Sequence, residues 1–246
     1  MSSAPSPAGE PVRFASRGSS HFDVLLALFC VVIVVSNIAA TKPIEVGSGS
    51  VTVGPVQFWP LVFDGGAVLF PLAYVLGDVI SEVYGFAAAR RAILVGFAAA
   101  LLATATFAVV DRIPGASFYE NQEAFSAVVG PVAQIVAASL AGYVTGQFLN
   151  AWVLVRMKER TAEHRLVARL VGSTGVGELA DTFIFCAIAA TAIGIDSVGV
   201  FLNYFVVGVL FKVAVELLVM PVTVRVIGWL KRREPTYWAE PAAPAR

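Results

Sequence analysis

Residues 65–85 read GGAVLFPLAYVLGDVISEVYG, and this stretch decides the fold. It is as long and as apolar as a segment that crosses a bilayer, for which about 20 mainly apolar residues are needed. Two acids, Asp78 and Glu82, interrupt it. A charge at the bilayer centre costs at least about 2.5–3.5 kcal/mol, so intramembrane acids tend to face a bundle interior or a wet cavity. The stretch therefore predicts a membrane helix that carries functional residues.

The composition of the whole chain agrees with a membrane protein. Hydrophobic residues make up 58% of the 246 residues and charged residues 14%, and the mean hydropathy is +0.80. Soluble domains carry about 25% charged residues, so a water-soluble globule is excluded. The basic residues are scattered, without the basic domain that a nucleic-acid partner requires. We therefore expect the lipid bilayer and a small molecule as partners, and no nucleic acid.

Six segments are long and apolar enough to span a membrane. They are 23–40, 65–85, 92–110, 132–155, 177–195 and 198–227. We predict an all-α integral membrane protein with six transmembrane helices in residues 21–230, a disordered cytosolic tail at 1–20 and a cytosolic C-terminal tail at 231–246. Glycines and a β-branched stretch predict a short external hairpin within 44–60.

The positions of the basic residues predict the orientation. Cytosolic loops of membrane proteins carry an excess of Lys and Arg. With six spans and both termini in the cytosol, 14 of the 17 basic residues lie in cytosolic segments. An odd number of spans would spoil this pattern. We therefore expect both chain ends on the cytosolic side.

Charged residues of three predicted helices reach a common depth. At a rise of about 1.5 Å per residue, residues of segments 65–85, 177–195 and 198–227 meet in the inner leaflet. They are Asp78, Glu82, Glu178, Asp181, Lys212 and Glu216. Lys212 and Glu216 are one helical turn apart and can neutralise one another, as a structural ion pair or as part of a proton path. Asp78 and Asp181 lack an obvious basic partner, which makes them the stronger site candidates.

Other polar and aromatic residues follow the same faces. The additional candidates are Asn37, Tyr74, Tyr143, Gln147, Asn150 and Phe185. Carboxylates accept paired N–H donors, and aromatic rings stack on a flat base, so the set suits a small, polar and even cationic solute. The alternative is that these groups only hold helices together or face cytosolic water. Gly142 and Gly146 have the spacing that permits close helix approach.

The same motifs resemble a known family. The resemblance rests on SNI at 36–38, FPL at 70–72, GDVISEVYG at 77–85, AR at 89–90, GF at 96–97, GST at 172–174 after Arg169, and GELADTFIF at 177–185. On these motifs the chain is similar to the queuosine precursor transporter family of the vitamin uptake transporter group. The similarity covers most of residues 22–230.

The resemblance implies import of 7-deazaguanine bases, such as the nitrile (preQ0), aminomethyl (preQ1) and queuine-like forms, across the bacterial inner membrane. Our own hypothesis places Asp78 or Asp181 on the guanine edge, with Glu82 and Glu178 as alternatives. Asn37, Gln147 and Asn150 are assigned to the carbonyl and ring nitrogen.

Several alternatives stay open at this point. Transport can be proton-coupled or facilitated with intracellular trapping. The chain can also carry another small vitamin-like solute, serve a separate energising module, or form a homo-oligomer. Gly77-Asp78 and Gly177-Glu178 faintly suggest an inverted repeat. An intramembrane enzyme is poorly supported, because His21 and His164 lie outside the spans and no H-E-x-x-H is present, and no metal or other cofactor is expected.

Overall fold

Long helices packed side by side make up most of the structure. The computed structural model describes residues 12–18, 20–39, 42–53, 56–129, 132–162, 164–189 and 198–238. Its helices are α1 (Ser20–Ala39), α2 (Phe70–Tyr84), α3 (Phe86–Arg112), α4 (Gln122–Val129), α5 (Val132–Thr161), α6 (Leu166–Ala189) and α7 (Val198–Arg233). Strands β1 (Pro43–Val53) and β2 (Val56–Asp64) and the 3₁₀ helix η1 (Gly65–Val68) connect α1 to α2.

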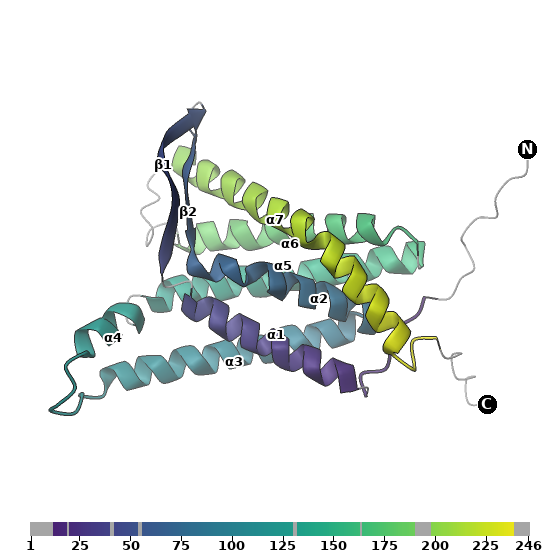
Figure 1. Ribbon diagram of the computed structural model, residues 1–246, viewed down its shortest axis with the longest axis horizontal. Coiled ribbons are helices and arrows are strands. Elements are labelled where there is room, and N and C mark those ends of the chain that lie inside the picture. The colour runs from purple at the N-terminus through teal and green to yellow at the C-terminus, as the bar shows by residue number, and fades with distance from the viewer. Residues whose placement is uncertain are drawn as a thin grey trace, which may run out of the picture.

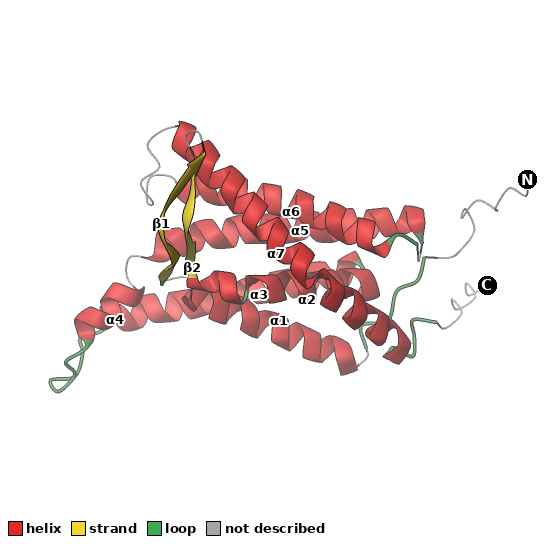
Figure 2. Ribbon diagram, turned by 45° about the horizontal axis from the view of Figure 1, so that its top comes forward, coloured by secondary structure: helices red, strands yellow, loops and turns green. Residues whose placement is uncertain are grey.

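The helices lie along one axis, with a different feature at each end. Figure 1 shows the hairpin β1–β2 across one end of the bundle, which we call the hairpin end. The opposite end, the termini end, holds the start of α1 and the end of α7, and the view in Figure 2 agrees. There the backbone N–H of Ser16 donates to Thr236 Oγ1 at 2.8 Å. The first and last described segments of the chain therefore meet at one end of the molecule.

Four of the described helices are long and apolar enough to cross a membrane. These spans are His21–Ala39, Phe86–Arg112, Leu166–Ile188 and Phe205–Arg233. Helix α2 has only 15 residues, which makes it about 22 Å long at 1.5 Å per residue and shorter than a hydrocarbon core of about 30 Å. Helix α5 carries a polar stripe. The structure is thus that of an all-α, multi-pass membrane protein, whereas the count of six spans and the cytosolic termini stay predictions.

Several predicted helix boundaries were wrong. Helix α2 begins at Phe70 and not at 65, because η1 precedes it and Pro71 occupies the first turn, where a fixed φ suits helix initiation. Helix α6 begins at Leu166 and not at 177. The prediction left out its first turns because they carry the charged Arg169, which the structure pairs with Glu82 inside the protein. Residues 190–195 of the same prediction lie outside the described residues.

The expected hairpin is present and slightly longer than predicted. The two strands pair antiparallel from Pro43 opposite Asp64 to Val53 opposite Val56. The register is irregular between Val46 and Val51. Gly47 lies in this irregular stretch with φ 109°, a conformation that favours glycine. The hairpin returns the chain from the end of α1 to the start of α2.

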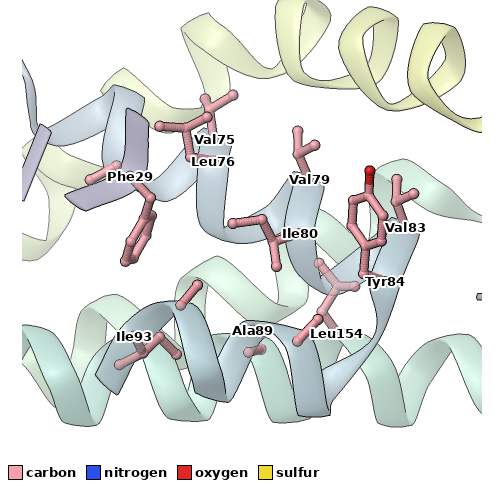
Figure 3. Packing of buried hydrophobic residues seen from close by; sticks show 14 of the residues in the cluster. Phe29, Val75, Leu76, Val79, Ile80, Val83, Tyr84, Ala89, Ile93 and Leu154 are labelled. Carbon is pink, nitrogen blue, oxygen red and sulfur yellow. The ribbon is translucent and has the colours of Figure 1, made fainter. Parts of the chain in front are cut away.

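Helix α2 lies at the centre of the bundle. Every residue from Ala73 to Gly85 is buried, and α1, α3, α5 and α7 all pack against this helix. Its apolar residues join a cluster with Phe29, Ile93 and Leu154 from three neighbouring helices (Figure 3). A short helix with two acids is therefore shielded by protein on all sides.

Gly85 makes the sharp break between α2 and α3. Its φ is +80°, which L residues with a side chain rarely adopt. A Cβ at this position would also lie 3.1 Å from the Phe14 ring. Glycine is thus required here by both the backbone conformation and the space.

Large apolar side chains cover the outside of the bundle. Exposed examples are Val31 on α1, Leu102 on α3, Leu179 and Phe183 on α6, and Leu218 on α7. On α6 these alternate with buried polar groups, which is the reverse of a soluble helix. So large an apolar surface suits lipid and not water.

The described part of the N-terminal tail differs from the sequence prediction. Residues 12–18 were assigned to a disordered tail, but Ala15 N–H donates to the Val83 carbonyl at 2.8 Å and Ala15 is 5% exposed. The prediction of disorder rested on the polar composition. In the structure a backbone hydrogen bond to Val83 and the close approach of the Phe14 ring to Gly85 hold residues 12–18 against the end of α2. Residues 1–11 and 239–246 lie outside the described residues.

Candidate functional site

The five acids predicted to lie in or beside the membrane are all buried. The exposed fractions are 0% for Asp78 and Glu82, 1% for Glu178, 3% for Asp181 and 5% for Glu216. None of them points into lipid. They do not form one layer, however, because their partners divide them into two clusters.

The first cluster, here called the acid layer, consists of Asp78, Glu178, Asp181, Glu216 and Lys212. Lys212 Nζ on α7 donates to Asp181 Oδ2 on α6 at 2.6 Å and lies 3.3 Å from Glu178 Oε2. The sequence spacing suggested Glu216 as the partner of Lys212, and the structure places two acids of α6 against it. An ammonium gains more from two carboxylates on the facing helix than from one a turn away on its own helix.

Glu216 completes the acid layer from α7. It interacts electrostatically with Asp78 and Glu178, both of the same charge sign. These interactions place acids of α2, α6 and α7 within reach of one another. Asp78 also interacts electrostatically with Glu82. Charged groups of the three helices thus approach one another as expected, while their role as a site stays a prediction.

Asp78 makes a different contact, with α5. Asn150 Nδ2 donates to Asp78 Oδ1 at 2.7 Å, and both residues are 0% exposed. Among the described residues, Asp78 Oδ2 and Asn150 Oδ1 are buried without a hydrogen-bond partner. Gln147 is also fully buried, and its Oε1 lies 2.5 Å from where a Cβ on Gly77 would stand. This part of the acid layer offers hydrogen-bonding capacity that the protein itself does not fill.

Two tyrosines border the acid layer. The rings of Tyr74 on α2 and Tyr143 on α5 meet edge to face, with centroids 6.0 Å apart. Tyr74 is 0% exposed and interacts electrostatically with Glu178 and Asp181. The predicted aromatic residues Tyr74 and Tyr143 are therefore brought to the acids.

Glycines let α5 and α6 approach closely beside Asp181. A Cβ on Gly142 would lie 2.6 Å from the Asp181 carbonyl oxygen, and one on Gly146 would lie 2.7 Å from Asp181 Cβ. Gly177 faces the Gly146 carbonyl at 2.8 Å in the same way. The expected close approach at Gly142 and Gly146 is confirmed, and it places the acids of α6 against α5.

The remaining predicted residues are Asn37 and Phe185. Asn37 Nδ2 donates to the Ile33 carbonyl of its own helix at 2.8 Å. It lies next to Ser36, whose hydroxyl bonds Gly66 at the hairpin end. No described hydrogen bond joins Asn37 to the acid layer. Phe185 lies one turn beyond Asp181, and its backbone nitrogen is near Gly142.

Glu82 belongs to a second group, the Glu82 cluster, formed with Lys158, Arg169 and Lys231. Its Oε1 lies 2.6 Å from Arg169 Nη2, 2.7 Å from Lys231 Nζ and 3.4 Å from Lys158 Nζ. Glu82, Lys158 and Arg169 are 0% exposed, and Lys231 is 8% exposed. Glu82 was predicted as a substrate residue beside Asp78, and the structure instead surrounds it with protein cations.

Sequence reasoning missed these three cations because it counted them as cytosolic charges. The sequence does contain one indication that Arg169 faces the interior. A helical spacing of four puts it on the same face as Ser173 and Gly177. No comparable pattern marks Lys158 or Lys231. Their partner is separated from them by 76 and 149 residues in the chain.

The two clusters differ in charge. The acid layer has four carboxyl groups and, among the described residues, one ammonium in ion pairs with them. Fully ionised, its formal charge is four negative plus one positive, or −3. Burial of uncompensated charge is expensive, so protons or a cationic, donor-rich ligand must neutralise part of it. A cluster with this charge can accept hydrogen bonds and positive charge.

Comparison with known proteins agrees with this chemistry. A family described as "Putative vitamin uptake transporter" matches residues 64–226, which include α2, α5 and α6 in full. A Bacillus subtilis protein named "Probable queuosine precursor transporter" is 31% identical over 189 residues, 76% of each chain. A Haemophilus influenzae protein of the same name is 27% identical over 158 residues, 64% of this chain and 65% of its own length.

No solved structure matches the chain. The family match covers both acidic motifs and Lys212, so the acid layer lies wholly inside it. It ends before Lys231, the last member of the Glu82 cluster. The chain thus belongs to the vitamin uptake transporter family, and it is a membrane transporter and not an enzyme.

Proposed function

We propose that the chain imports 7-deazaguanine precursors of queuosine across the bacterial inner membrane. The observation that carries the proposal is the acid layer, in which three helices contribute four buried carboxyls and two of these pair with the ammonium of Lys212. The names of the two relatives point to the same class of solute. A 7-deazaguanine base has the donors that such a site lacks.

Asp78 is the best candidate for the guanine edge. A carboxylate accepts two parallel N–H bonds, and a guanine-like ring offers N1–H beside its exocyclic amine. Asp78 Oδ2 has no hydrogen-bond partner among the described residues, whereas Asp181 is already bonded to Lys212 at 2.6 Å. This difference favours Asp78 over Asp181, and it removes Glu82 from the set because three cations already contact it.

The neighbouring residues supply the remaining recognition. Asn150 and Gln147 carry amides for the carbonyl and ring nitrogen, and Tyr74 and Tyr143 flank the same space. Glu178 and Glu216 are the acids for the ammonium of an aminomethyl base, because a buried cation requires a carboxylate partner. Asn37 Nδ2 already donates to the Ile33 carbonyl of its own helix, so we assign Asn37 no solute contact.

Proton coupling is part of the proposal. A buried carboxyl that takes up a proton from outside and releases it inside together with the solute would tie solute entry to proton entry. The acid layer has more acids than Lys212 pairs with, and these supply the groups for this co-transport. The competing function is uptake of another small vitamin-like solute, alone or with a separate energising module, and the family description favours that class as the alternative.

Uptake of labelled base tests the proposal. Cells that cannot make 7-deazaguanines are supplied with labelled nitrile and aminomethyl bases, with and without the chain, and label in tRNA and in the soluble pool is counted. We expect chain-dependent uptake that unlabelled bases compete and unrelated vitamins do not. Uptake of a labelled vitamin by the chain, with no uptake of labelled base, would contradict the proposed solute.

An uncoupler separates the energetic alternatives. Counting only free label in the first seconds excludes intracellular trapping. We expect the uncoupler to abolish accumulation above the external concentration. Equilibration that continues unchanged in its presence would assign the chain to facilitated transport.

A further inference from the structure

We propose that the Glu82 cluster is the gate of the transport pathway at the termini end of the bundle. In the structure its ion pairs hold that end closed, and they must separate for a solute to pass. The same residues would move whichever solute is carried.

The cluster joins four helices at one oxygen atom. Glu82 on α2 is contacted by Arg169 of α6 at 2.6 Å, Lys231 of α7 at 2.7 Å and Lys158 of α5 at 3.4 Å. The same α2, α6 and α7 also carry the acid layer, with α5 contributing Asn150. Separating the Glu82 pairs would thus free the helices that surround the proposed solute site.

Both ends of the described chain close over the cluster. Lys158 Nζ donates to the Arg13 carbonyl at 2.9 Å and to Tyr237 Oη at 2.8 Å. It also lies 4.6 Å from the centre of the Phe14 ring. Residues before α1 and after α7 therefore cover the same ammonium and seal the termini end.

A second contact set ties these segments to the helices. Tyr84 Oη donates to Glu234 Oε1 at 2.6 Å, and His21 Nδ1 lies 3.0 Å from the same oxygen. Glu234 is 1% exposed although it follows the last helix. The cover is thus bound at several points and is not a loose tail.

The cluster lies directly beside the acid layer. Glu82 follows Asp78 by four residues on α2, which is about 6 Å along the helix. On α6, Arg169 precedes Glu178 by nine residues, or about 13 Å in the same direction. A solute that leaves the acid layer towards the termini end therefore meets the Glu82 cluster next.

The contacts suit a gate that opens better than a contact that stays closed permanently. Three cations share one carboxylate, and among the described residues Glu82 Oε2 and Arg169 Nε are buried without a hydrogen-bond partner. Separating a buried ion pair is costly when it leaves a charge uncompensated. Because three cations share Glu82, one of them can move away while the carboxylate keeps the other two.

Accessibility of a buried reporter tests the gate without a solute. Thr174→Cys on α6 is placed in the full chain with Cys30→Ser and Cys186→Ala, since Thr174 is 2% exposed and lies between Arg169 and Glu178. Membrane vesicles of both orientations are treated with a membrane-impermeant thiol reagent. With Glu82→Gln we expect labelling from the termini side to become at least about tenfold faster, because the closed state loses its shared anion.

Two controls separate gating from general loosening. Glu159→Gln removes an exposed acid from the Arg156 ion pair on α5 and must leave labelling unchanged. A second reporter, Ala138→Cys, is buried nearer the hairpin end of α5. Its labelling must stay slow in Glu82→Gln protein. Faster labelling of both reporters would show a loosened bundle and overturn the gate.

A milder variant covers the case in which Glu82→Gln protein does not accumulate. Lys231→Met keeps Glu82 paired with Arg169 and removes one tie to α7. We expect faster Thr174→Cys labelling from the termini side here too. Unchanged labelling in folded protein of either variant would overturn the proposal, whereas failure of base uptake alone would overturn only the proposed solute.

Discussion

The acid layer and the Glu82 cluster occupy neighbouring turns of α2 but have opposite charge balance. Glu82 is one carboxylate among three cations, and the acid layer has four carboxyls and one described ammonium. One site has more cations than acids, and the other has more acids than cations. Sequence spacing put Asp78 and Glu82 into one set, and only their partners separate a proposed solute ligand from a proposed gate.

The largest loss of stability is expected when Lys212, the ammonium paired with two acids of the acid layer, is removed. Lys212→Met leaves Asp181 and Glu178 without their common ammonium. The Lys212 side chain is 25% exposed, but its two acids are only 1% and 4% exposed, and removing the partner of a buried charge costs up to about 3–5 kcal/mol. Thermal unfolding in detergent should therefore shift much further than in Lys231→Met protein, where Glu82 keeps Arg169 at 2.6 Å.

The same variant has a predicted pH dependence. Protonation at acidic pH removes the repulsion among the acids, so the stability deficit of Lys212→Met should shrink as the pH falls and grow as it rises. Thermal unfolding measured across the pH range checks the sign. Equal losses for Lys212→Met and Lys231→Met at every pH would contradict the assigned difference between the clusters.

Asp78→Asn should separate solute binding from stability. The amide oxygen of the new Asn can still accept the bond from Asn150 Nδ2. The position of Asp78 Oδ2, an acceptor, is taken by an amide nitrogen, which is a donor. A lost hydrogen bond to a charged group is worth about 1.5–3 kcal/mol, so initial base uptake should fall about 10- to 100-fold at normal abundance. Asp23→Asn, an exposed acid at the start of α1, is the matched control. Wild-type uptake by Asp78→Asn protein would remove Asp78 from the site.

Close packing behind the acid layer gives the next effect. Gly146→Ala would place a Cβ 2.7 Å from Asp181 Cβ and 2.8 Å from the Gly177 carbonyl. Overpacking of this kind costs about 1–3 kcal/mol. Gly175→Ala is the control, because its Cβ would meet nothing within 4 Å. Similar unfolding temperatures for the two variants would show that α5 and α6 separate more easily than the contacts indicate.

The smallest effect is expected at an exposed ion pair on the same helix as Lys158. Arg156 Nη1 lies 2.8 Å from Glu159 Oε2, with side chains 57% and 45% exposed. Exposed pairs contribute about 0–1 kcal/mol because solvent screens them. Arg156→Gln should leave the unfolding temperature and base uptake close to wild type. A loss as large as that of Lys231→Met would mean that burial does not distinguish these basic residues.

Much of the architecture was predictable from residue patterns. Apolar runs indicated the helices, the glycine-punctuated β-branched stretch indicated the hairpin, and the helical spacing put Asp78, Glu178 and Asp181 on interior faces. Boundaries failed where a charge is neutralised by a distant partner, as at Arg169 in α6. A hydropathy pattern treats a charged residue such as Arg169 as evidence that a segment is not buried. It cannot include the neutralising partner, because Glu82 lies far away in the sequence.

The sequence by itself determined the class of protein, its family motifs and the burial of its acids, because lipid allows charged groups few other places. The tertiary structure alone decided the partners. Lys212 bonds to Asp181 of α6, and Glu82 meets Arg169 and Lys231, 87 and 149 residues away in the chain. Ion pairs depend on distances of a few ångströms, and only helix packing brings residues so far apart in the chain that close.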